Sequence, residues 1–189
     1  KEVKADYVHN VYDDATHMAT SEMLHSVKMM DLKALPDAAY FIPCPKSPHG
    51  VDVDPSGEYI TAGGKLSAVI PVYAFKKIQA AIAGKQFEGD FEGIPVIKYE
   101  AALAGEVQKP GLGPLHTEFD DKGNAYTTMF ISSEIVKWKV STQQVLDRRP
   151  VYYSPGHLMV PGGETRKPYG QYVSALNKIT KDRYLPTGP

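Results

Sequence analysis

The feature that most constrains this chain is a loop rich in proline and glycine that leads into a histidine and then into short strands. Residues 110–114 hold two prolines and two glycines, a composition that excludes helix, and His116 follows. Residues 121–124 have the composition of a tight turn. Beyond it, residues 125–131 and 134–140 are rich in β-branched and aromatic residues. We therefore expect His116 at the end of a loop, ahead of a meander of short antiparallel strands.

The same order of features occurs at two other places in the chain. His49 precedes Gly57 by eight residues and His116 precedes Gly123 by seven, and each glycine is followed by a tyrosine and then a threonine. A more degenerate third copy places His157 behind a Pro-Gly pair, with a strand expected later over residues 171–177. Repeated strand meanders of this size are typical of a β-propeller or a related array.

The remaining patterns predict short strands with two helices between them. Apolar residues at helical spacing predict helices over residues 21–30 and 75–83, the second ended by Gly84. Residues 86–108 are expected to form a mostly polar connection. Further short strands are predicted over residues 39–43, 58–61, 68–73 and 96–97, and a helical turn over residues 99–103. The fold class is therefore all-β, with the helices as insertions.

Composition excludes several classes of protein. The net charge is −1 and the mean hydropathy is −0.31, whereas nucleic-acid and membrane-surface proteins need a basic excess. No apolar run approaches the length of a membrane span. Cys44 is the only cysteine, which excludes an internal disulfide, and we expect it to be a small buried residue. The chain opens on Lys1 and ends at Pro189, so we expect it to be part of a longer polypeptide.

Three histidines in matched repeats are the chemical clue. Equivalent positions of successive propeller blades point at one axis, so His49, His116 and His157 are expected to converge on one site. Neutral imidazole is a good ligand for copper, zinc and iron. The other histidines lie at residues 9, 17 and 25, and no shared site is expected there, because eight helical residues rotate a side chain by about 80°.

Several short motifs occur in order along residues 40–189. They are Ser47-Pro48-His49-Gly50, Gly113-Pro114-Leu115-His116-Thr117, Gly123-Asn124-Ala125-Tyr126-Thr127, Pro155-Gly156-His157-Leu158 and Lys178-Ile179-Thr180-Lys181-Asp182. In order and spacing these motifs resemble the nitrous oxide reductase family, and the sequence of residues 152–159 is similar to its atypical branch.

The resemblance implies a particular fold and set of metal sites. In that family an N-terminal seven-bladed β-propeller holds a four-copper sulfide cluster, CuZ, and a cupredoxin domain carries a dinuclear copper centre, CuA. Residues 1–189 would form about three blades of that propeller, with the cupredoxin domain absent. By motif, His49, His116 and His157 correspond to three of seven cluster ligands. Lys178 matches a lysine at the cluster edge, where substrate is thought to bind. The family resemblance makes calcium a possible further ion, but Ser47 stands where the better-known branch has an asparagine that contributes to the calcium site, and this departure weighs against such a site here.

The resemblance also implies an activity, the two-electron reduction of nitrous oxide to dinitrogen and water in denitrification. It implies a periplasmic homodimer that receives electrons from a c-type cytochrome or a cupredoxin, with no nucleic-acid partner, and a chain inactive by itself. Glu118 and Asp120 are candidates to hydrogen-bond the ring of His116. Two other functions remain open at this point: a non-catalytic propeller that displays loops to a protein partner, and a propeller hydrolase with a single calcium or zinc ion.

Overall fold

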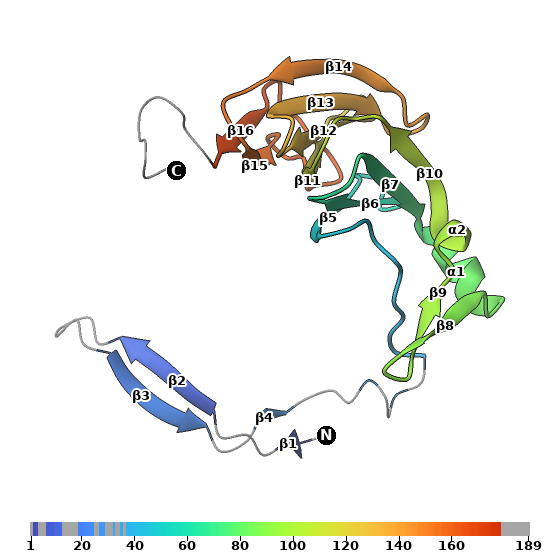
Figure 1. The fold of residues 1–189 in the computed structure, drawn as a ribbon, viewed down its shortest axis with the longest axis vertical. Coiled ribbons are helices and arrows are strands. Elements are labelled where there is room, and N and C mark those ends of the chain that lie inside the picture. Colours follow the sequence, from blue (N-terminus) through green and yellow to red (C-terminus); the bar gives the residue numbers. More distant parts are fainter. Residues whose placement is uncertain are drawn as a thin grey trace.

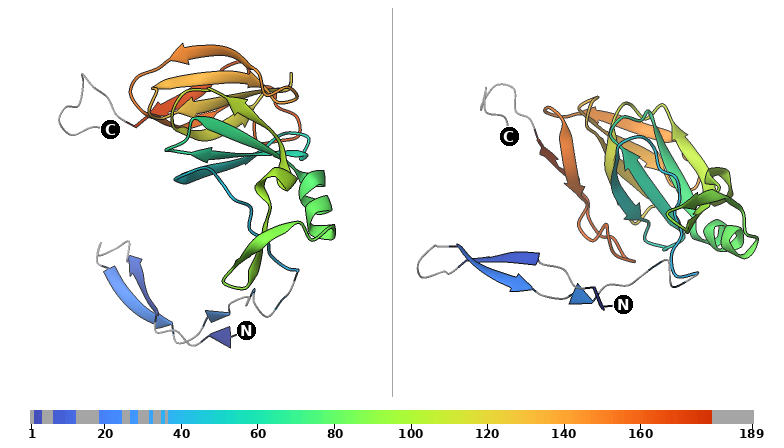
Figure 2. Two further views of the ribbon diagram at one scale, coloured as in Figure 1. Left: turned by 45° about the vertical axis from the view of Figure 1, so that its right-hand side comes forward. Right: turned by 60° about the horizontal axis from the view of Figure 1, so that its bottom comes forward.

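The computed structural model describes residues 2–3, 7–12, 19–24, 27–28, 32, 35 and 37–178 of the chain. All of the paired strands in its sheets are antiparallel (Figures 1 and 2), which confirms the all-β propeller prediction. There are two four-stranded sheets, and the remaining sheets have two strands each.

Two four-stranded sheets and one strand pair make up the repeated part of the fold. The first blade has the order β10-β7-β6-β5 and the second the order β11-β12-β13-β14, and β15 pairs with β16. In chain order the strands of the first blade are β5 (Pro48–Val53), β6 (Tyr59–Gly64), β7 (Val69–Ala74) and β10 (Leu103–Gln108). The others are β11 (Pro114–Phe119), β12 (Asn124–Met129), β13 (Glu134–Lys139), β14 (Val145–Pro150), β15 (Pro155–Met159) and β16 (Ser174–Asn177).

The three units follow one another around an arc. Figure 1 shows β5, β11 and β15 on the concave side and β10 and β14 at the outer rim. The strand β11 lies against β5 on one side and β15 on the other. The first strand of each unit is therefore its innermost strand, as in a propeller.

The first blade carries an insertion between β7 and β10. It consists of α1 (Phe75–Ala83), β8 (Phe87–Phe91), β9 (Ile94–Ile97) and α2 (Tyr99–Ala102). The α1 helix is confirmed: Gly84 caps it by donating its backbone N–H to Ala80 O. The predicted polar connection is wrong in part, because β8 pairs with β9 and β10 completes the blade. Among the described residues, no helix is long and apolar enough to cross a lipid bilayer.

Two predictions near residues 39–44 also need correction. Residues 39–43 do not form a paired strand; only Phe41 makes an isolated parallel bridge, to Val96 of β9. Cys44 is exposed rather than buried. It lies in the extended segment that leads into β5, outside both apolar clusters of the core.

The helix predicted over residues 21–30 is wrong where the structure describes it. Residues 19–24 form β3 (Ala19–Leu24), which pairs with β2 (Tyr7–Tyr12), and β4 (Val27–Lys28) pairs with β1 (Glu2–Val3). Residues 25, 26, 29 and 30 lie outside the described residues. An isolated helix of about ten residues is only marginally stable. Pairing with β2, which is rich in Val and Tyr, therefore outweighs the helical spacing of the apolar residues.

Apolar side chains form two clusters, one on each face of the first blade. The first cluster joins the two blades, and the second lies between the first blade and its insertion. The first contains Ile70, Val72, Val107, Phe119, Ala125, Met129, Val136, Trp138 and Val140. The second contains Ala62, Tyr73, Ile78, Ala81, Ile97 and Ala102.

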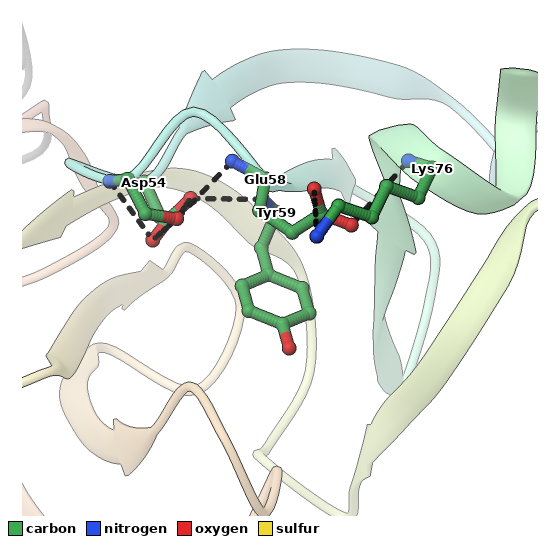
Figure 3. A network of polar contacts seen from close by, with 5 residues as sticks. Asp54, Glu58, Tyr59 and Lys76 are labelled. Carbon is green, nitrogen blue, oxygen red and sulfur yellow. Dashed lines mark hydrogen bonds and ion pairs between the residues drawn. The ribbon is translucent and has the colours of Figure 1, made fainter.

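The turn between β5 and β6 is tied to the insertion by polar contacts, drawn in Figure 3. The Asp54 carboxylate accepts hydrogen bonds from the backbone N–H of Ser56 and of Tyr59 at 3.2 and 2.8 Å. Glu58 accepts one from Lys76 N at 3.3 Å, at the start of α1, and its carboxylate lies 4.0 Å from Lys76 Nζ. The turn therefore also fixes the first turn of the helix.

Candidate metal centre

Each of the three histidines lies in the innermost strand of its unit, at a point where the strand contains one extra residue. In β11, Pro114 pairs with Met129 and Thr117 with Thr127, so two residues face one on the partner strand. The same irregularity occurs in β5 and β15. His116 is therefore inside a strand, not at the loop end that the sequence suggested. The two-residue bulges are residues 49–50, 115–116 and 156–157.

The histidines do not occupy identical positions in these bulges. His116 and His157 are the second bulge residue, whereas His49 is the first. Gly50 fills the second position in β5, and a β-carbon there would lie 2.7 Å from His116 Nδ1 and 2.4 Å from Leu115 O. Glycine at this place lets the backbone of one blade approach the imidazole of the next.

The structure brings the three imidazole rings together, although 67 and 41 residues separate them in the chain. The ring centroids of His49 and His116 are 5.1 Å apart with the planes at 79°, and those of His116 and His157 are 4.4 Å apart with the planes at 27°. The rings pack on one another, and each comes from the innermost strand of one of three successive units. Of the other histidines, His9 lies in β2, and His17 and His25 lie outside the described residues.

The surroundings favour the neutral form of two of these rings. Burial, followed by the charges of His116, Lys178 and His157, lowers the pKa of His49 below its ordinary value. Burial, followed by His157 and Lys178, lowers the pKa of His116 in the same direction. A neutral imidazole has a free lone pair, which is the form that binds a metal ion.

Lys178, expected beside these histidines, lies close to them. It follows β16, and its backbone N–H donates to Ser154 O at 3.0 Å. Its side chain lies over Gly156, where a β-carbon would come within 3.1 Å of Nζ. The glycine before His157 thus leaves room for the side chain of Lys178.

A carboxylate that the sequence reasoning missed lies next to His116. Asp52 of β5 accepts a hydrogen bond from Thr117 N at 2.7 Å, and its Oδ1 lies 3.6 Å from His116 Nδ1. Burial raises the pKa of Asp52 to about 6, against the effect of the Thr117 hydrogen bond. The signal in the sequence was its place three residues after His49, but only the structure shows that it serves the histidine of the next blade.

The two predicted partners of His116 are engaged elsewhere. Asp120 accepts hydrogen bonds within its own turn, from Asn124 Nδ2 at 2.7 Å and from Tyr126 OH at 3.0 Å. Glu118 lies against Gly163, where a β-carbon would meet its Oε2 at 2.0 Å. Within the described residues that oxygen has no hydrogen-bond partner. Burial, together with the charge of Glu164, raises the pKa of Glu118 to about 7.

The donor set fits copper in its chemistry and in its distribution over the fold. Imidazole nitrogens suit copper, and three of them are supplied by three separate strands. In the part of the chain that is described, no three His, Cys, Asp or Glu side chains are arranged to hold one ion. A cluster of several ions does not require that arrangement, because each imidazole can bind a different ion. It does require the stacked rings of His116 and His157 to separate, and His157 is the exposed member of that pair.

Comparison with known proteins shows which family this chain is similar to. Residues 148–189 match the family described as "Nitrous oxide reductase propeller repeat". Nitrous-oxide reductase of Stutzerimonas stutzeri is 38% identical over 159 residues, and that of Ralstonia nicotianae is 38% identical over 160. The protein of the same name from Cupriavidus necator is 37% identical over 160 residues. Each of these matches covers 79% of this chain and 23% of the relative, so the chain spans about a quarter of their length.

Similarity to solved structures is looser. A structure of hydrazine synthase from Kuenenia stuttgartiensis aligns with a TM-score of 0.46 at 12% identity, over 67% of this chain and 30% of that one. Likeness at this level does not allow sites to be compared.

Proposed function

Because this chain belongs to the nitrous oxide reductase family, we propose that His49, His116 and His157 hold part of a copper-sulfide cluster at which nitrous oxide is reduced. The observation that carries the proposal is the meeting of three imidazoles from three successive inner strands. When bound, such a cluster would supply the two-electron chemistry that converts nitrous oxide into dinitrogen and water.

The chain's own residues would hold the cluster and set the local charge. The lowered pKa values of His49 and His116 favour the neutral, ligating form. Lys178 places a positive charge beside the rings, where it would stabilise negative charge that develops on the substrate oxygen, or donate a proton to it. Lys178 is thus the proposed catalytic residue.

Other properties of the family are proposed for the whole protein. They are a periplasmic location, a homodimer, a dinuclear copper centre in a further domain, and an electron donor such as a c-type cytochrome or a cupredoxin. Residues 1–189 would be part of the N-terminal propeller. Calcium near Ser47 remains a prediction.

The alternative functions have less support. A propeller that only displays loops to a partner has no need of three packed imidazoles and a lysine at its axis. A hydrolase with one metal ion finds no support among the relatives reported above, which are nitrous-oxide reductases.

Replacing single side chains in the enzyme tests the proposal. His116→Ala should lose cluster copper and nitrous oxide reduction, while the absorption of the dinuclear centre stays intact. Lys178→Ala should retain copper and lose turnover by about 10²–10⁴-fold, the usual contribution of a positioned acid. His9→Ala, in a separate sheet, is the control and should change neither property. Full copper content and normal turnover in His116→Ala would refute the assignment.

A further inference from the structure

The carboxylate of Asp52 crosses from the first blade to the second and contacts the segment that carries His116. Its Oδ2 accepts the backbone N–H of Thr117 at 2.7 Å, and its Oδ1 faces His116 Nδ1 at 3.6 Å. Both contacts go to the next innermost strand, not to the strand that holds Asp52. The Asp52 side chain therefore contacts both the backbone and the imidazole ring at the same point of β11.

A second observation shows which way the His116 ring is turned. A β-carbon on Gly50 would lie 2.7 Å from Nδ1 and 3.0 Å from Cε1 of the ring. The Nδ1 edge thus packs against β5, whose Gly50 and Asp52 are two residues apart. The other ring nitrogen, Nε2, is the one not held by β5.

We propose that Asp52 is a positioning residue that keeps the proton of His116 on Nδ1 and leaves Nε2 as the nitrogen that binds copper; this rests on the function proposed above. A carboxylate accepts an N–H and repels a lone pair, so it stabilises the Nδ1–H tautomer. The ring nitrogen that carries no proton is then fixed before any metal arrives. A partner of this kind also raises the basicity of the ligating nitrogen.

The matching position of the second blade shows that the arrangement is specific to Asp52. After each bulge, strand pairing resumes at Val51 in β5 and at Thr117 in β11. Asp52 and Glu118 are the residues that come next, so they occupy matching positions. The Glu118 carboxylate is directed to Gly163, away from the rings. In β15 the corresponding residue is Met159, which has no carboxylate. Of these three related positions, only that of Asp52 serves a histidine.

The test compares two substitutions at Asp52 in the full-length enzyme. Asp52→Asn keeps an oxygen that can accept Thr117 N–H but lacks the negative charge facing Nδ1, whereas Asp52→Ala removes both. Asp54→Asn, in the adjoining turn, is the matched control. The readouts are copper affinity, the visible absorption of the reconstituted cluster, and the ¹⁵N chemical shifts of His116 in the metal-free enzyme, which report the tautomer directly.

We expect His116 to carry its proton on Nδ1 in the parent enzyme and to gain the Nε2–H form in Asp52→Asn. Copper affinity should fall by about 10–100-fold in both Asp52 variants and stay unchanged in Asp54→Asn. An Nε2–H tautomer in the parent, or an unchanged tautomer and copper affinity in Asp52→Asn, would overturn the proposal. If the parent binds no copper, the proposed function fails, and the tautomer measurement still decides the role of Asp52.

Discussion

In both blades, the residue that lies opposite the bulge of the innermost strand contacts the unit that follows, but the side chain at this position differs between the two blades. In the first blade, Gly63 of β6 faces the bulge, and a β-carbon there would lie 2.1 Å from Leu115 O of the second blade. In the second blade the position is Thr128, whose hydroxyl donates to Gly156 O at 2.6 Å. One junction is closed by backbone contact and the other by a buried hydrogen bond. Equivalent blades therefore need not approach the units that follow them equally closely.

The outward faces of the two blades differ as well. The first blade covers its far face with its own insertion, through Ile78, Ala81, Ile97 and Ala102. The second blade has only a short connection between β13 and β14 and packs instead against β15. The first blade is thus covered on its far face by its own insertion, whereas the second blade is covered by the strand pair that follows it.

The largest expected effect is a loss of folding stability. It compares a residue at the junction between the two blades with a residue in the insertion cluster. Trp138 is fully buried between the blades, and its Nε1 donates to Thr127 Oγ1 at 2.9 Å. Trp138→Ala should lower the free energy of unfolding by about 3–5 kcal/mol, because it leaves a large cavity. Ile78→Ala, at the edge of the insertion cluster, should cost about 2 kcal/mol. Denaturant titration measures both, and equal losses would mean that the insertion matters as much as the blade junction.

A smaller effect is expected where the blades approach through glycine. Gly63→Ala places a carbon against the backbone carbonyl of Leu115, which cannot turn aside, and should cost about 1–3 kcal/mol. Gly105→Ala is the control, because its new carbon would meet only the flexible end of the Gln143 side chain. The two variants are compared by thermal unfolding. A stability of Gly63→Ala as high as that of Gly105→Ala would show that the junction can open without cost.

The smallest effect concerns the turn of the second blade. The pKa of Asp120 lies below its ordinary 3.8, because hydrogen bonds from Asn124, Lys122 and Tyr126 outweigh the effect of burial. The stability that this carboxylate contributes is therefore present above pH 3.8 and is lost as pH falls through its folded pKa. Asp120→Asn should cost about 1–2 kcal/mol near neutral pH.

The same variant should also flatten the loss of stability between about pH 5 and about pH 2, since the residue no longer titrates. Unfolding followed across this pH range in parent and variant supplies the check. An unchanged pH profile would assign the acid sensitivity to other carboxylates.

Much of this architecture can be predicted from the sequence, because strand, turn and histidine recur in a fixed order. The strands of the second blade and the α1 helix follow from local alternation and spacing. The error over residues 21–30 arose where a weak helical period competed with strand pairing, which no local window detects. The gathering of the three histidines could be expected from repetition.

The contacts that position the candidate site could not be predicted in the same way. Asp52 acts across a blade junction on His116, 64 residues further along the chain. The nearer carboxylates, Glu118 and Asp120, looked more plausible because they are close in sequence. Strand alternation alone does not say which side chains of successive innermost strands meet, since the extra residue in each of them changes that alternation.

The extra residue in each innermost strand has a further consequence for how such a site can evolve. A strand has a two-residue period, and one additional residue shifts its phase by half a period, so the segments on either side can vary independently. The bulge itself can direct either of its two residues to the site, as the offset of His49 relative to His116 illustrates. The segment after it keeps the apolar phase that the blade junction needs. A deletion of one bulge residue would therefore exchange inside for outside along the rest of that strand.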